Sequence, residues 1–186
     1  MTKFLAHEKV WLRAEIDEGI AQNQTASTDM AAAIEAGNQW HDNAEYDEVI
    51  ERMKLIDSRF GPMAKEFANR EVVPYPEPES DTASLGTLLT LKDEYTKFNA
   101  LLVGMGRIGE DAYSGWHKED FPDADFEVIG FESPIGEASM GARLGDTVSW
   151  QVGERVMSAE VQAINNSWLI QYVGDIATAE TTEIDE

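Results

Sequence analysis

A short polar run at residues 39–43, Gln-Trp-His-Asp-Asn, holds the side chains of this sequence that are best placed to do chemistry. Asp42 offers a carboxylate, and His41 and Glu45 lie close enough along the chain to contribute. The sequence contains no cysteine, which excludes disulfides and thiolate metal sites. Its three histidines are scattered and have no ligand spacing between them: His7, His41 and His117. The question is whether this run is a functional site or only a change in chain direction.

The segment after this run predicts a helix that needs a partner. Its apolar residues recur in alternating steps of three and four: Tyr46, Val49, Met53, Ile56, Phe60, Met63 and Phe67. Such a heptad seam is typical of a coiled coil, and a seam this narrow must pack against a second helix. Gly61-Pro62 lies inside the seam, and proline there should kink the helix or start a second segment.

The preceding segment, residues 3–36, is the simplest partner. Its expected apolar points are Leu5, Leu12, Ile16, Ile20, Met30 and Ile34. The polar middle of this segment predicts a local break near Thr28. Gly37 can end the first helix and Asp42 can cap the second. The result is an antiparallel hairpin about 45 Å long, at about 30 residues per arm. The alternative is two helices of an ordinary bundle, although no third helical pattern follows.

The second half of the chain has a different period. A linker with three prolines, VVPYPEPESDTAS, is followed by short β-rich runs: 85–91, 95–103, 126–131, 147–152, 155–164 and 168–173. Ser133 to Met140 predicts one short helix, with Ser133 as its cap and Pro134 at its first position. Residues 105–125 form a long irregular insertion. The fold class is therefore α+β, a helical hairpin plus a small antiparallel β-domain.

We divide the chain into four parts on these grounds. The coiled-coil domain spans residues 1–71, the proline-rich linker 72–84, the β-domain 85–175 and an acidic tail 176–186. The sequence has 36 acidic and 14 basic residues, a formal charge of −22. This charge argues against independent DNA binding or an anionic membrane surface, and favours a basic protein partner. With no signal peptide or membrane-length apolar run, we expect a cytoplasmic monomer.

Two motifs resemble the Gre family of bacterial transcript-cleavage factors, GreA and GreB. Asp42-Asn43-Ala44-Glu45-Tyr46 is similar to the start of that family's second helix. Residues 133–150, SPIGEASMGARLGDTVSW, are similar to a stretch of its FKBP-like β-domain, and residues 85–104 look like its opening strands. The resemblance covers most of residues 10–164 and implies a factor that binds RNA polymerase rather than an independent enzyme.

The resemblance also implies a mechanism. Family members dock their β-domain on the rim of the polymerase secondary channel and pass the coiled coil toward the active site. Acidic tip residues then help to hold a catalytic Mg²⁺ and its water, so that polymerase cleaves the 3′ end of backtracked RNA. The factor has no cofactor of its own. By this resemblance Asp42 is the tip carboxylate that contacts the shared Mg²⁺, with Glu45 and His41 as weaker candidates.

The tip departs from the family pattern in two respects. The first of the two acidic tip positions is Gln39, and a neutral amide cannot supply negative charge to a metal. Glu35 stands where an RNA-attracting arginine is expected. These departures leave two interpretations open, a cleavage factor with a weakened tip and a secondary-channel inhibitor without cleavage. The tip residues Gln39, Trp40 and Asn43 are expected to contact the polymerase.

The β-domain should meet the channel rim. By the resemblance, Ser133, Pro134 and Ile135 are the expected contacts there. An FKBP-like domain also raises the alternative of a prolyl isomerase or chaperone, which would need an aromatic-lined pocket. A third alternative is an acidic decoy that mimics nucleic acid, which would leave the tip and the seam without a purpose.

Overall fold

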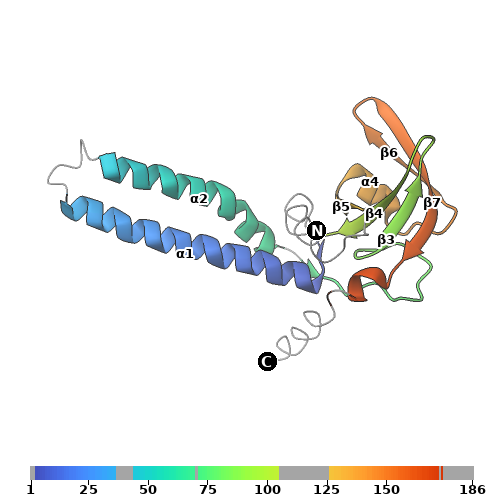
Figure 1. The fold of residues 1–186 in the computed structure, drawn as a ribbon, viewed down its shortest axis with the longest axis horizontal. Helices are drawn as coiled ribbons and strands as arrows, with labels where there is room; N and C mark the ends of the chain where they lie inside the picture. Colours follow the sequence, from blue (N-terminus) through green and yellow to red (C-terminus); the bar gives the residue numbers. More distant parts are fainter. Residues whose placement is uncertain (1–2, 37–43, 70, 105–125, 172, 174–186) are drawn as a thin grey trace. The chain divides into compact units, whose positions relative to one another are not determined.

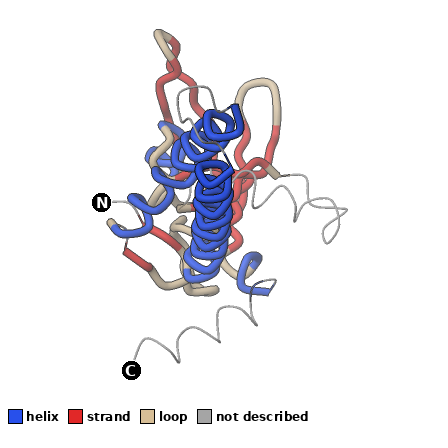
Figure 2. The backbone as a smooth tube through the Cα atoms, turned by 90° about the vertical axis from the view of Figure 1, so that its left-hand side faces the viewer, coloured by secondary structure: helices blue, strands red, loops and turns tan. Residues whose placement is uncertain are grey.

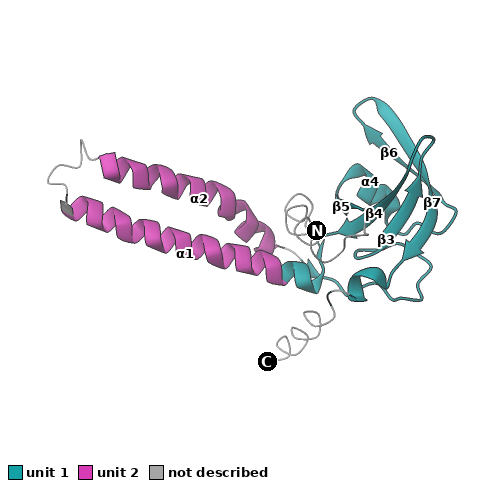
Figure 3. Ribbon diagram, viewed as in Figure 1, with its two compact units in different colours: residues 1–9, 71–186 teal, residues 10–70 magenta. Residues whose placement is uncertain are grey.

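A computed structural model describes residues 3–36, 44–69, 71–104, 126–171 and 173. The chain forms two compact units, coloured separately in Figure 3. Unit 2 is residues 10–70, and unit 1 combines residues 1–9 with residues 71–186. The predicted α+β class, a helical hairpin and a small, mostly antiparallel sheet, is confirmed (Figure 1).

Unit 2 is an antiparallel helical hairpin. Helix α1 spans Ala6–Ala36 and helix α2 spans Ala44–Ala68. Ion pairs between the helices join Asp29 to Arg52 and Glu15 to Arg59. Partner numbers fall along α1 as they rise along α2, which is the signature of antiparallel helices.

The seam predicted on α2 is confirmed, and the expected counterpart before it is confirmed only in part, at the buried Leu5 and Leu12. Val49, Ile56 and Phe60 are buried together with Ala26 of α1. The expected points Ile20 and Ile34 are 49% and 54% exposed, so that part of the prediction is wrong. Within the hairpin unit the buried positions of α1 lie seven apart, and beyond Leu12 they are small residues: Gly19, Ala26 and Ala33. Small side chains on one helix let the large side chains of the other interdigitate.

Two further expectations concern helix continuity. Helix α1 has no break near Thr28, because the hydroxyls of Thr25, Ser27 and Thr28 donate to carbonyls four residues earlier and remain within the helix. Helix α2 continues through Pro62 without a second segment. Its ribbon bends toward its C-terminal end (Figure 1), as proline inside a helix requires.

We expect Gly19→Ala to destabilise the hairpin by about 1–3 kcal/mol, in spite of the better helix propensity of alanine. A Cβ atom at Gly19 would lie 2.4 Å from Cγ of Phe60 and 2.8 Å from its Cβ, atoms too near the backbone to swing away. The matched control is Gly61→Ala, where nothing lies within 4 Å of the added atom. Urea unfolding followed by the helical circular dichroism signal measures both variants. Equal midpoints for the two would contradict this packing.

Unit 1 is built on a five-stranded sheet in the order β5-β4-β3-β7-β6. The strands are β3 (Leu88–Lys92), β4 (Lys97–Val103), β5 (Glu127–Gly130), β6 (Thr147–Val152) and β7 (Arg155–Asn165). All neighbours are antiparallel except β4 and β5, which are parallel, so the expectation of a purely antiparallel sheet is corrected at this pair. Figure 2 shows these strands in red, seen from another side.

Helix α4, Pro134–Ser139, packs against β6. Its Ile135 and Ala138 contact a core that includes Leu91, Leu102 and Val161. The short helix predicted from Ser133 is therefore confirmed in kind and place. One strand prediction is wrong, because residues 168–171 are helical. The side-chain oxygen of Asn165 accepts hydrogen bonds from the amide and the hydroxyl of Ser167. The fully buried Leu169 and Val173 lie four residues apart, which is a helical spacing.

The first residues of the chain lie with the sheet unit and not with the hairpin unit to which we assigned them. Strand β1 (Lys3–Phe4) pairs in parallel with β2 (Glu71–Val72). The two strands lie close along the sequence to the two points where the chain passes from one unit to the other. Phe4 and Leu5 are buried, so apolar burial holds this pairing in place. In the described part of the chain, no helix is long and apolar enough to cross a membrane.

Candidate functional site at the hairpin end and on helix α4

The tip residues Gln39, Trp40, His41, Asp42 and Asn43 lie outside the described residues. The structure describes the two helix ends that flank them. Helix α1 ends at Ala36 and helix α2 begins at Ala44, so these five residues belong to the connection between the two arms. In an antiparallel hairpin the described helix ends that flank them, Ala36 and Ala44, lie at the same end of unit 2.

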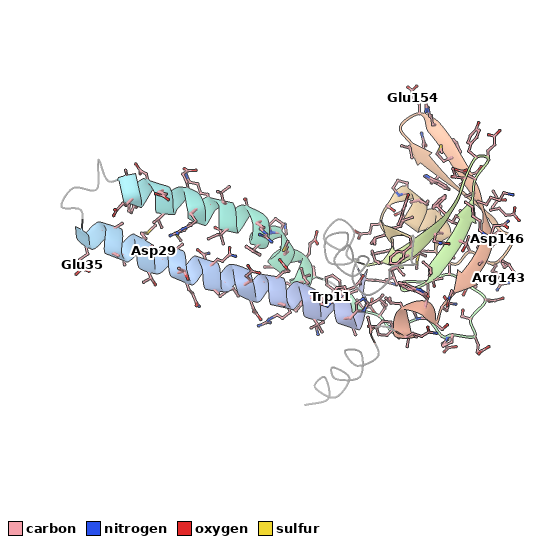
Figure 4. All side chains as sticks on the ribbon, viewed as in Figure 1. Trp11, Asp29, Glu35, Arg143, Asp146 and Glu154 are labelled. Carbon is pink, nitrogen blue, oxygen red and sulfur yellow. The ribbon has the colours of Figure 1, made fainter. Side chains whose placement is uncertain are left out.

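Glu45, the weaker candidate for metal contact, lies exposed in the first turn of α2 together with Asp47. Two carboxylates in a first turn stabilise the positive end of the helix dipole. Glu35 is exposed on the last described turns of α1 (Figure 4). The helix ends beside the tip are thus acidic on both arms.

A groove of about 340 Å³ opens between the arms near this end. It is lined by Asp29, Ala32, Ala33, Glu45, Glu48, Val49 and Arg52. Asp29 and Arg52 form an ion pair there, with each side chain almost half exposed, so the pair adds little stability. Three carboxylates against one guanidinium make the groove negative.

Sequence reasoning did not anticipate this groove. Its lining includes the small side chains of Ala32 and Ala33, and small residues on α1 carry no apolar signal strong enough to mark a seam. Among the residues that the structure describes, no three or more histidine, aspartate or glutamate side chains are arranged to hold a metal ion.

The second candidate surface is helix α4, where the structure separates the three predicted residues by role. The Ser133 hydroxyl accepts a hydrogen bond from the Gly136 amide at 3.1 Å and caps the helix. Ile135 packs on the core. Pro134 at the first helical position and Glu137 are exposed. Of the predicted trio, Pro134 is the residue that presents most surface to a partner.

A buried polar cluster at the start of α1 was missed entirely by sequence reasoning. Glu8 is fully buried, and its carboxylate accepts hydrogen bonds from the amides of Leu5 at 2.7 Å and Gly104 at 2.9 Å. A glutamate at the third helical position that accepts from the cap residue is half of a capping box. Here the second oxygen also fixes the end of β4, so Glu8 ties the helix start to the sheet.

His7 lies in the same cluster. Its Nδ1 lies 2.6 Å from the hydroxyl of Tyr75, and the two rings stack. Burial lowers the pKa of His7 to about 3. The imidazole is therefore neutral at physiological pH, and its role is packing and hydrogen bonding rather than proton transfer.

The structure defines a class of two-unit proteins in which an antiparallel helical hairpin accompanies a small sheet domain. Residues 118–166 match the family model described as transcription elongation factor, GreA/GreB, C-term. Similar curated proteins are the transcription elongation factors GreA of Thermoanaerobacter pseudethanolicus, 25% identical over 86% of this chain and 87% of that protein, and of Lachnoclostridium phytofermentans, 28% identical over 68% and 71%. These matches confirm the predicted resemblance to the Gre family of transcription elongation factors.

The chain also has a likeness to a solved structure. The crystal structure of GreA factor homolog 1 (Gfh1) of Thermus thermophilus covers 89% of this chain and 99% of its own, at 17% identity and a TM-score of 0.38. At this TM-score the likeness adds no argument about activity.

Proposed function

We propose that this protein binds RNA polymerase at its secondary channel and delivers the tip of the helical hairpin toward the active site. The observation that carries the proposal is the match of residues 118–166 to the GreA/GreB family, in a chain whose other unit is a helical hairpin. A hairpin suits this task, because its arms of 31 and 25 residues, α1 and α2, form a rod roughly 40 Å long at about 1.5 Å per residue. The partner is a bacterial-type polymerase.

Within this function, Asp42 is the residue we propose to assist the polymerase-bound Mg²⁺. A carboxylate is the oxygen ligand that this ion prefers, and one or two of them suffice beside its waters. The metal would supply charge stabilisation for phosphoryl transfer. This chain would contribute the Asp42 carboxylate, and its helical hairpin would carry that carboxylate to the polymerase active site.

The competing proposal is a secondary-channel regulator that occupies the channel without stimulating cleavage. It is favoured by the acidic groove of Asp29, Glu45 and Glu48 and by the exposed Glu35, because a negative hairpin end repels the RNA 3′ end. Gln39 supports the same interpretation, since the tip then has one fewer carboxylate.

Binding to core RNA polymerase is the first test of either form. With a chain charge of −22, we expect the dissociation constant to rise at least about tenfold as ionic strength goes from low to high, because screening weakens charge attraction. Fluorescence anisotropy of the labelled protein over a salt series measures it. Failure to bind at low salt would contradict the proposed function. Binding that does not depend on salt would contradict only the expected electrostatic contribution to affinity.

A further inference from the structure

Helix α1 carries a second heptad pattern beside the column of residues that is buried against α2. The residues of this pattern recur in steps of four, three, four, three and four: Ile16, Ile20, Asn23, Ser27, Met30 and Ile34. Alternating steps of three and four keep side chains on one narrow band of a helix, as in a coiled-coil seam. We name these six residues the α1 stripe. The buried column, which begins at Leu12 and continues in steps of seven, shares no residue with it.

The contacts between the two arms show on which flank of the hairpin the α1 stripe lies. The ion pairs to α2 start from Glu15 and Asp29. Each of these residues follows a member of the buried column by three positions, so its side chain turns to one side of the contact between the arms. Ile16 and Met30 follow members of the column by four positions and turn to the opposite side. The stripe therefore lies on the flank opposite the two ion pairs.

Helix α2 widens this flank with apolar side chains. Met53 follows the buried Val49 by four positions and lies on the side of the stripe, whereas Arg52 follows it by three and lies on the side of the ion pairs. Ile50 lies further round on the side of the stripe, and both Ile50 and Met53 are half-buried. Among the α1 stripe and positions 46, 50, 53, 57, 60 and 64 of α2, only Asp57 is charged.

The α1 stripe is only partly covered by α2. Ile20 is 49% exposed and Ile34 is 54% exposed, while Ile16 and Met30 are half-buried. The side-chain oxygen of Asn23 is buried, and within the described part of the chain it accepts no hydrogen bond. A single polar residue in an apolar seam fixes register and the number of helices in coiled coils, at a cost in stability. The stripe thus has the composition of a helix-packing surface.

The α1 stripe reads the same in both directions. Its order is apolar, apolar, polar, polar, apolar, apolar, and its steps are symmetric about position 25. When two copies of α1 lie antiparallel about a twofold axis at this position, Ile16 meets Ile34 of the second copy. Ile20 then meets Met30 of the second copy, and the two polar residues meet their counterparts. A twofold interface requires this self-complementarity, because each residue contacts its partner twice, once from each copy.

Charge favours a second copy as the occupant of this flank. The chain has a formal charge of −22, so two copies repel one another over most of their surface. The flank of the stripe is the exception, because Asp57 is its one charged residue at the positions named above. A basic partner would find no row of carboxylates there, and nucleic acid would find no row of cations. An equally uncharged apolar flank is the matching surface.

The area of the flank indicates how strong the pairing should be. From Ile16 to Ile34 the stripe is about 27 Å long at 1.5 Å per residue, and two arms of about 10 Å each make the flank about 20 Å wide. Two such flanks bury roughly 1,000 Å², which is at the lower limit for a specific interface. The pairing should therefore be weak and reversible.

We propose that the α1 stripe is a self-association surface, through which two copies of this chain pair their hairpins antiparallel into a four-helix arrangement. The chain is a monomer when dilute, as the sequence analysis expects, and pairs as its concentration rises. A paired hairpin is twice as wide as a single one, so pairing competes with any partner that takes up the single rod. This inference goes beyond the proposed function and does not depend on it.

Sedimentation velocity of the full chain over a concentration series tests the pairing. We expect the average mass to rise toward that of a dimer between roughly 10 and 300 µM, as for a small interface. Added salt should strengthen the pairing, because it screens the repulsion between two acidic chains while the apolar contact remains. This salt dependence is opposite in sign to the one expected for polymerase binding, so the two associations are distinguishable.

The Ile20→Glu, Ile34→Glu double variant should weaken the pairing at least about tenfold, because it places like charges inside the apolar contact. The matched control is Leu55→Glu, which should change the pairing less than about threefold. Leu55 is 69% exposed on α2, but it precedes the buried Ile56 by one position and so lies on the flank of the ion pairs. All three side chains are exposed, so helical circular dichroism and thermal midpoints should stay close to wild type.

Disulfide crosslinking tests the antiparallel arrangement, since the chain has no cysteine of its own. A mixture of the Ile16→Cys and Ile34→Cys variants should form a mixed disulfide dimer under mild oxidation. Neither variant should crosslink alone, because equivalent positions lie about 27 Å apart along the paired helices, far beyond the reach of a disulfide.

Several results would overturn the inference. A wild type that stays monomeric over the whole series would do so, as would unchanged pairing by the double variant or an equal loss in Leu55→Glu. Disulfide dimers of one cysteine variant alone would exclude the antiparallel arrangement. A monomeric wild type whose polymerase binding is lost in the double variant would make polymerase the occupant of the stripe. Failure of the unaltered protein to bind polymerase would contradict the proposed function and leave the pairing as it stands.

Discussion

Glu8→Ala is expected to lower the free energy of unfolding of unit 1 by about 3–5 kcal/mol, because it leaves two buried amides without their acceptor. These are the amides of Leu5 and Gly104, which the Glu8 carboxylate accepts at 2.7 and 2.9 Å. The backbone is closely packed at Gly104, since a Cβ there would lie 2.1 Å from the Lys3 carbonyl oxygen. The start of α1 and the end of β4 should loosen together.

Amide hydrogen exchange at Leu5 and Gly104, with denaturant unfolding in parallel, measures this effect. Glu8→Gln should lose less, because its amide oxygen can still accept one of the two hydrogen bonds. The surface control is Glu18→Ala, an exposed glutamate on the same helix whose removal should leave unit 1 unchanged. Wild-type protection of both amides in Glu8→Ala would contradict the role assigned to this carboxylate.

The second large effect concerns the chemistry of the tip. If the protein stimulates cleavage of backtracked RNA, Asp42→Ala should reduce the stimulated rate by at least about tenfold while polymerase binding stays unchanged, because the carboxylate that would hold the polymerase Mg²⁺ is removed. Gln39→Asp should raise the rate by adding a second carboxylate. Gain of cleavage in Gln39→Asp from an inactive wild type would identify a regulator that has moved away from cleavage.

Asp57→Ala is the matched control, since Asp57 is an exposed aspartate further along α2. The readout is the shortening of labelled RNA in stalled polymerase complexes, with and without each variant. Cleavage that is stimulated equally by wild type and by Asp42→Ala would exclude Asp42 from the active role. A wild-type protein that suppresses the intrinsic cleavage of polymerase would favour the regulator.

How far the sequence predicted the hairpin depends on side-chain size. On α2 the large residues Val49, Ile56 and Phe60 mark the seam by themselves, and the structure buries all three. On α1 the buried column begins at Leu12, which the sequence analysis expected, and continues at Gly19, Ala26 and Ala33, whose small side chains carry no apolar signal. Ile20 and Ile34 drew the prediction to the wrong face, because hydrophobicity is a weak guide to burial for isolated surface residues.

The sheet domain shows a similar limit. The helix after Ser133 could be predicted, because a cap residue followed by proline is a local signal. The buried Glu8 and the pairing of β1 with β2 could not, because both depend on residues about 70 to 100 positions away along the chain. The tip residues Gln39 to Asn43 lie outside the described residues, so their roles stay predictions.

The central claim is that the hairpin end reaches the polymerase active site, and site-directed radical cleavage tests it most directly. The chain has no cysteine, so a single Glu45→Cys substitution gives one attachment point for an iron chelate beside the tip. Lys65→Cys, near the other end of α2 and about 30 Å away at 1.5 Å per residue, is the matched control. We predict that the chelate at position 45 cuts polymerase segments lining the active site and the RNA 3′ end, and that the control does not. Cuts confined to the outer surface of polymerase, or identical patterns from both positions, would contradict it.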